Sequence, residues 1–169
     1  APGAVTEVST TGILTTAEFT SSFDDPLDAT SFSDPTVTPV ILRDVSLTLT
    51  DAIAVDNGDG VAGGGDTIRY TAVLSNNGNT PELCGTLVSL GGAETTLVLG
   101  SVTSDFGMVL LGNRPGDTDV GVDLGEVDPG RTVTITWDAN VTDPLGMGVT
   151  QTSAQVMLTA TNLPTTVSD

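Results

Sequence analysis

Apolar and polar residues alternate along much of this chain, in short runs separated by glycine, asparagine, aspartate and proline. The clearest run is residues 132–137, where Val133, Ile135 and Trp137 fall on one side of an extended chain and threonines fall on the other. A strand with one apolar face is typical of a layer that packs against a second layer. Helical spacing of apolar residues is absent, so the pattern predicts strands alone.

These runs predict short strands, and the turns between them carry the residues that tight turns require. The predicted strands span residues 5–15, 40–54, 66–76, 83–90, 95–102, 108–111, 120–124, 132–141 and 150–161. Asn77-Gly78 and Asp128-Pro129-Gly130 are typical turn sequences. Many short strands with frequent turn signals indicate an all-β fold, which we predict to be an immunoglobulin-like antiparallel β-sandwich.

The segment 24–39 differs from the rest of the chain. It holds Pro26, Pro35 and Pro39 among aspartate, serine and threonine, with few apolar residues. Such composition is typical of an extended linker. The linker divides the chain into an N-terminal arm, residues 1–23, which we expect to be an extended strand, and a sandwich domain, residues 40–169.

The arm has the same pattern as the end of the domain. A fixed offset that sets Val5 against Val149 gives identical residues at several further positions: Thr6 and Thr150, Ser9 and Ser153, Leu14 and Leu158, Thr15 and Thr159, and Asp25 and Asp169. The arm therefore resembles the last strand of a preceding repeat, which predicts a tandem array or a polymer of such units.

Composition restricts the partners of the chain. With 4 basic and 22 acidic residues the net charge is −18, and nucleic acids and anionic membranes both require basic patches. The acidic residues are expected either to solvate the surface of an extracellular protein or to bind divalent cations. No run of about 18 apolar residues is present, so we expect no membrane insertion. Cys84, the only cysteine, is predicted to be a small buried hydrophobe, with an intermolecular thiol as the alternative.

Absent residue types argue against enzymatic activity. The chain has no histidine, and its four basic residues are all arginine: Arg43, Arg69, Arg114 and Arg131. This excludes Ser/His and Cys/His nucleophiles, Schiff-base lysines and imidazole-bound zinc. Carboxylate-pair glycoside hydrolysis usually needs aromatic platforms for the sugar, and Trp137 and Tyr70 are the only Trp and Tyr. We therefore expect a protein that is not an enzyme.

One segment has nearly the spacing of a calcium-binding loop. Counted from Val55, Asn57 is third, Asp59 fifth, Gly60 sixth, the carbonyl of Val61 seventh and Asp66 twelfth. The first position holds valine where aspartate is usual, so Asp56 would have to serve there. The candidate ligands for Ca2+ are thus Asn57, Asp59, Val61, Asp66 and Asp56. The alternative is a glycine-rich turn between two strands that holds no metal.

Several ordered segments carry a family resemblance. They include residues 56–60, 65–71, 76–79, 112–118, 124–130 and 143–150, with spacer-like residues 24–26 and 34–39. In this order they resemble the domain-of-unknown-function-11 repeats of bacterial and archaeal surface proteins. The resemblance covers nearly the whole chain. It implies an immunoglobulin-like sandwich in surface-exposed tandem arrays, filaments or adhesins, without assigned catalytic residues.

Two functions follow from these observations. The first is a structural subunit or repeat of an extracellular filament, fibre or stalk, assembled from copies of the chain, head to tail, by strand addition. The alternative is an adhesin module whose calcium-ordered loops bind carbohydrate or protein. The sequon Asn140-Val141-Thr142 is also a candidate site for a glycan.

Overall fold

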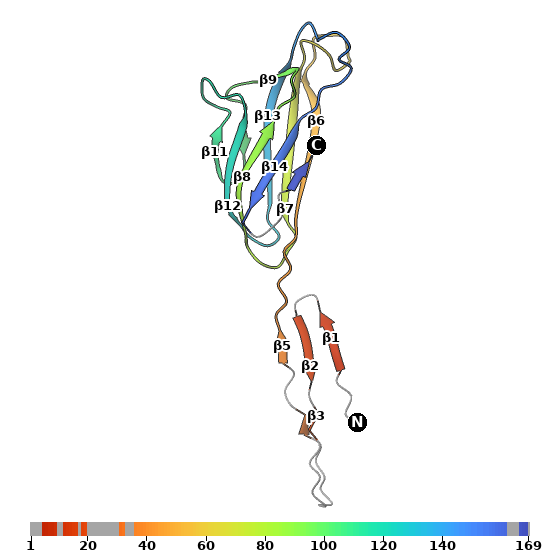
Figure 1. The fold of residues 1–169 in the computed structure, drawn as a ribbon, viewed down its shortest axis with the longest axis vertical. Helices are drawn as coiled ribbons and strands as arrows, with labels where there is room; N and C mark the ends of the chain where they lie inside the picture. Colours follow the sequence, from red (N-terminus) through yellow and green to blue (C-terminus); the bar gives the residue numbers. More distant parts are fainter. Residues whose placement is uncertain are drawn as a thin grey trace, which may run out of the picture. The chain divides into compact units, whose positions relative to one another are not determined.

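The structure is a computed structural model that describes residues 5–9, 12–16, 18–19, 31–32, 36–161 and 166–168. The chain divides into two compact units, Ala1–Leu42 and Arg43–Asp169. Every regular element in the described part is a β-strand, as the ribbon in Figure 1 shows. The described residues accordingly include no helix that is long and apolar enough to cross a membrane.

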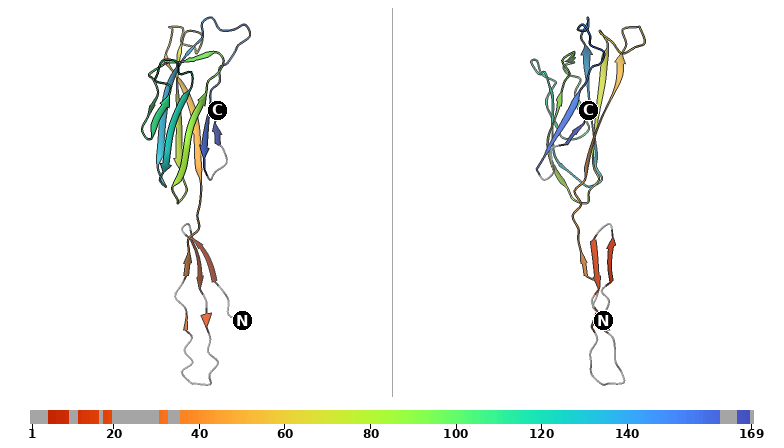
Figure 2. Two further views of the ribbon diagram at one scale, coloured as in Figure 1. Left: turned by 60° about the vertical axis from the view of Figure 1, so that its left-hand side comes forward. Right: turned by 45° about the vertical axis from the view of Figure 1, so that its right-hand side comes forward.

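The larger unit is a sandwich of two antiparallel sheets (Figures 1 and 2). The first sheet has the order β10-β13-β7-β6, and β9 also pairs with β13. Its strands are β6 (Val45–Val55), β7 (Thr67–Asn76), β9 (Thr95–Leu97), β10 (Thr103–Ser104) and β13 (Thr132–Val141). The second sheet has the order β11-β12-β8-β14-β15. Its strands are β8 (Glu82–Leu90), β11 (Met108–Leu111), β12 (Val120–Val127), β14 (Gln155–Ala160) and β15 (Thr166–Ser168).

The core lies between the two sheets and is mainly aliphatic. Its largest fully buried apolar side chains are Leu74, Leu87, Leu124, Ile135 and Leu158, which come from five different strands. Strand β13 shows how the sequence produces this core. Val133 and Ile135 are fully buried and Trp137 is almost so, whereas Thr132 is exposed. The predicted orientation of this strand is confirmed, and the all-β sandwich fold with it.

The buried polar side chains of the described residues are paired. Among the described residues, no buried side-chain nitrogen or oxygen lacks a hydrogen-bond partner. Asn76, at the end of β7, donates from Nδ2 to the carbonyls of Thr80 and Val127 at 2.9 Å each. Cys84 is fully buried, as predicted, and burial raises the pKa of its thiol, with the charge of Glu82 adding to the shift.

The smaller unit contains two separate sheets. Strands β1 (Val5–Ser9), β2 (Gly12–Thr16) and β5 (Thr36–Thr38) form one sheet in the order β1-β2-β5, and β3 (Glu18–Phe19) pairs with β4 (Ser31–Phe32) in the other. The prediction of one strand over residues 5–15 is therefore wrong. Ser9 pairs with Gly12, so the segment folds back as a hairpin and pairs its own backbone at a small loop-closure cost.

Other predicted segments also differ from the structure, and the strand expected over residues 40–54 begins only at Val45. Residues 24–39, expected to be a linker, include β4 and β5, and of their other residues the structure describes only Pro39. The predicted strand 95–102 is shorter because Gly100, at φ +86°, turns the chain after β9. The predicted strand 150–161 begins only at Gln155, and residues 149–154 have no strand pairing in the structure.

Candidate functional site

The candidate calcium loop connects β6 to β7 and is held by side-chain oxygens that accept backbone N–H groups. Asp56 Oδ1 accepts hydrogen bonds from the amides of Gly58, Asp59 and Gly60 at 2.7, 3.1 and 3.3 Å. These bonds, led by the one from Gly58, lower the pKa of Asp56. Gly58 and Gly60 have φ values of +109° and +75°, which side-chain-bearing residues rarely adopt. The sequence thus encodes a tight, carboxylate-centred turn.

Asp66 closes the loop from inside the protein. Its side chain is fully buried; Oδ1 accepts the amide of Asn57 at 2.8 Å and Oδ2 accepts the amide of Gly63 at 2.8 Å. Its backbone carbonyl accepts the amide of Val141, and Gly65 donates to the carbonyl of Val141. The Asp66 side chain therefore ties the start of the loop to its end, and the backbone at that end pairs with Val141 of β13.

The remaining candidate ligands bond to neighbours within the loop. Asn57 donates from Nδ2 to the carbonyl of Gly64 at 3.0 Å and accepts the amide of Asp59 at Oδ1. Asp59 Oδ1 accepts the amide of Val61, whose side chain is exposed. In the described part of the chain, no three acidic, cysteine or histidine side chains form a group suited to a metal ion. The loop is thus ordered by its own hydrogen bonds, and Ca2+ binding stays a prediction.

A groove opens beside this loop, between the first sheet and the connection from β13 to β14. One cavity of about 260 Å3 is lined by Asp51, Ile68, Leu145 and Thr152, among others. A second, of about 220 Å3, adjoins it and shares Asp51 and Thr152. Both cavities are lined by apolar and polar surface.

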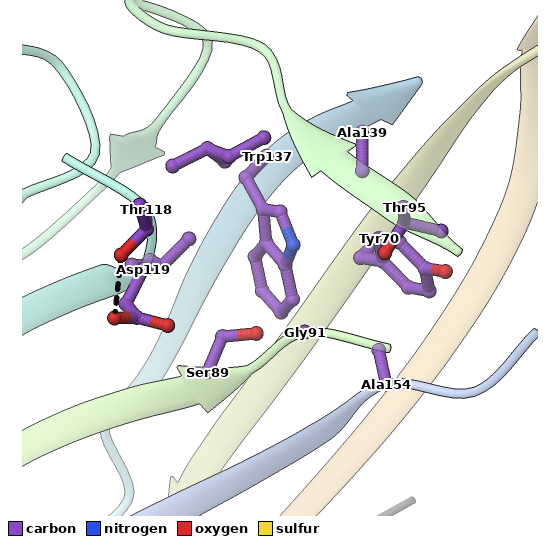
Figure 3. A pocket seen from close by; sticks show the side chains of 11 residues that line it. Tyr70, Ser89, Gly91, Thr95, Thr118, Asp119, Trp137, Ala139 and Ala154 are labelled. Carbon is purple, nitrogen blue, oxygen red and sulfur yellow. Dashed lines mark hydrogen bonds between the residues drawn. The ribbon is translucent and has the colours of Figure 1, made fainter. Parts of the chain in front are cut away.

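A stacked aromatic pair adjoins the groove, because Tyr70 lines the second cavity and stacks on Trp137 (Figure 3). The rings of Tyr70 and Trp137 have centroids 5.5 Å apart and an interplanar angle of 22°. Burial raises the pKa of Tyr70, and a side-chain hydrogen bond with Thr152 opposes that shift. Tyr70 thus joins the stacked pair to the polar side of the groove.

Both rings of the pair also line a small cavity of about 30 Å3. Figure 3 shows Ser89, Thr118 and Asp119 around the Trp137 ring, and Thr118 donates to Asp119 Oδ2 at 3.0 Å. A cavity of this size holds about one water molecule. It is too small for a sugar or a cofactor.

Sequence reasoning missed one of the two fully buried carboxylates, Glu82. Glu82, at the start of β8, is fully buried, and both of its carboxylate oxygens accept hydrogen bonds from Arg43 Nη1, at 3.0 and 2.9 Å. The two residues are 39 positions apart, and no motif links them. The only signal in the sequence is the scarcity of basic residues, because a buried carboxylate in such a chain has few possible partners.

The predicted glycosylation site lies on the surface. Asn140 is exposed near the end of β13, and its Oδ1 accepts a hydrogen bond from Thr67 Oγ1 at 2.8 Å. Glycosylation of Asn140 stays a prediction.

No protein-family model matches the chain, and no curated protein matches it. Among solved structures, one similar fold is a Corynebacterium diphtheriae protein named as membrane-anchored, with a TM-score of 0.52, 14% identity, and coverage of 92% of this chain and 41% of that one. Another is the T6 backbone pilin of serotype M6 Streptococcus pyogenes, with a TM-score of 0.49, 10% identity, and coverage of 99% and 45%. This chain thus spans less than half the length of either protein. The similarity to the first shows a shared fold.

Proposed function

We propose that this chain is a structural unit of an extracellular filament, fibre or stalk, in which neighbouring copies join head to tail by strand addition. The observation that carries the proposal is the correspondence between β2 and β14. The offset that sets Val5 against Val149 places residues 12–16 on residues 156–160, and both segments are strands. Leu14 and Thr15 then match Leu158 and Thr159.

Strand β14 shows how a strand with this side-chain pattern completes a sheet. It pairs with β8 inside the second sheet, where Val156 and Leu158 are buried in the core. A domain has one position of this kind, and β14 is attached to the domain it completes, so it fills that position at high effective concentration. A second copy of the pattern is not needed within the same domain. We assign it to contact between units.

The net charge and the composition support a structural role outside the cell. The net charge of −18 keeps such a protein soluble, and the absence of histidine and lysine removes the common catalytic groups. The fold is shared with a protein named as membrane-anchored, which is compatible with a surface location. The resemblance to the domain-of-unknown-function-11 repeats leads to the same proposal.

Deletion of residues 1–23 tests this function. The unit Arg43–Asp169 is compact by itself, so the truncated chain should retain its circular dichroism spectrum and a cooperative melt. The full chain should form assemblies that light scattering and electron microscopy detect, and the truncated chain should stay monomeric. Unfolding of the truncated chain, or assembly equal to that of the parent, would contradict the proposal.

The alternative is an adhesin module with calcium-ordered loops, favoured by the ligand-like spacing of Asn57, Asp59 and Asp66. It predicts binding to a glycan array or to host matrix proteins that disappears with a chelator and in Asp59→Ala. A monomeric full chain that binds such a ligand would favour this function over the filament.

A further inference from the structure

In the second half of β6, the side chains that the alternating pattern directs inward are not covered by the opposing sheet. In the first half of the strand, Val45, Leu47 and Leu49 are buried or half-buried and the residues between them are exposed. The same alternation should place Asp51 and Ile53 on the inner face, opposite Tyr70 and Ile68 of β7. Yet residues 50–55 are all exposed, and Ile53 is 40% exposed.

The opposing layer explains this exposure. Strand β14 begins at Gln155, so only the connection over residues 145–154 lies across from this part of β6. The groove described above separates the two. Strand β6 is also the last strand of its sheet among the described residues, so one of its backbone edges has no hydrogen-bonded strand. Strand β15 of the second sheet lies close to β6 but does not pair with it. An exposed edge next to an unfilled groove is the usual acceptor for an added strand.

We infer that this edge, residues 50–55 of β6, accepts strand β1 of a second copy of the chain, an inference that rests on the proposed function. The added strand would extend the first sheet past β6, and its inward side chains would close the groove beside Asp51 and Thr152. Because the contact joins different surfaces of two copies, it repeats without closing and yields a filament.

Three observations favour β1 as the occupant. Strand β1 is the last strand of its own sheet in the described part, so one of its backbone edges is available to pair with another strand. The repeat offset places it on residues 149–153, of which Val149 and Thr152 already line the groove. Its charge is also low: residues 5–16 hold a single ionisable side chain, Glu7, so the strand adds little repulsion to a chain of net charge −18.

A matched pair of substitutions in the full chain tests the acceptor. Ile53→Asp places a carboxylate at the inner face beside Asp51, whereas Ala52→Asp adds the same charge to the neighbouring, exposed position of the same strand. Ile53→Asp should raise the protein concentration needed for assembly about tenfold or more, and Ala52→Asp should change it little. Equal effects of the two variants would overturn the inference.

Disulfide mapping provides a measurement that does not depend on variant stability. Chains with Glu7→Cys are mixed with chains that carry Ile53→Cys, and non-reducing gels are used to detect the mixed dimer. Only intermolecular contact can give that product, and Cys84 is buried. The control partner is Met108→Cys on the exposed edge strand β11. Cross-linking to Ile53→Cys in clear excess is expected; equal or greater cross-linking to Met108→Cys would place the acceptor elsewhere.

These results separate the two proposals. If deletion of residues 1–23 abolishes assembly but Ile53→Asp assembles like the parent, strand addition stands and the β6 acceptor is wrong. If the full chain is monomeric at every concentration, both proposals fail.

Discussion

Arg43 and Glu82 form an ion pair in which one partner is fully buried and the other is only partly so. Arg43 Nη1 lies 2.9 Å from Glu82 Oε2, and the Arg43 side chain is 35% exposed. The pair connects the residue that opens the larger unit to the first residue of β8. It therefore fastens the beginning of the domain to the second sheet.

Loss of Arg43 should destabilise the domain strongly. Arg43→Ala leaves the Glu82 carboxylate buried without its cation, and we expect a loss of about 2–4 kcal/mol, since breaking a buried pair typically costs about 3–5 kcal/mol and Arg43 is partly solvated. Glu82→Gln should cost less, because the amide oxygen still accepts from Arg43. Urea unfolding followed by tryptophan fluorescence measures both. An Arg43→Ala midpoint equal to that of the parent would contradict this account.

Removal of the Trp137 side chain should empty part of the core. Trp137→Ala eliminates the stack with Tyr70 and should cost about 3–5 kcal/mol. Thr134→Ala, on the opposite face of β13, is the control and should change stability by less than about 1 kcal/mol. Calorimetry of the two variants gives the comparison. Similar melting temperatures for both would disprove the orientation of the strand.

Asp117 should make stability depend on pH. Its Oδ2 accepts the amides of Gly112 and Arg114 at 2.7 and 2.9 Å, and these bonds, led by the one from Arg114, lower its pKa from the usual 3.8. A lowered folded-state pKa contributes stability above the unfolded-state value, and that stability is lost as pH falls through the folded-state value. Asp117→Asn should therefore melt below the parent at pH 7, with a smaller difference at pH 2. A constant difference across this range would show that the carboxylate charge plays no part.

Calcium is predicted to stabilise the loop between β6 and β7. Millimolar Ca2+ should raise the melting temperature of the parent by mass action, and Asp59→Ala should remove the shift. Asp128→Ala, an exposed carboxylate in the turn before β13, should leave the shift intact. Identical melts of the parent in calcium and in chelator would show that Asp56 and Asp66 act only as acceptors for backbone amides.

Local pattern was sufficient for much of the fold. Residues 132–141 and 108–111 form strands as predicted, and the inward positions of β13 follow directly from alternation. This succeeds because one buried sheet face imposes a period of two on each strand by itself. The sequence alone also excludes reactions that need an imidazole or a lysine amine, because histidine and lysine are absent whatever the fold.

The contacts that depend on distant parts of the chain were decided only by the tertiary structure. Residues 5–15 have a strand pattern, but alternation cannot show that they turn back on themselves. Asp66 has the spacing of a metal ligand, but its buried position directs both oxygens to the amides of Asn57 and Gly63. Ile53 is exposed although it is on the inner face of its sheet, because β14 begins only at Gln155, about a hundred residues later in the chain. Alternation specifies which face of a strand is apolar, whereas the cover over that face depends on how remote segments pair.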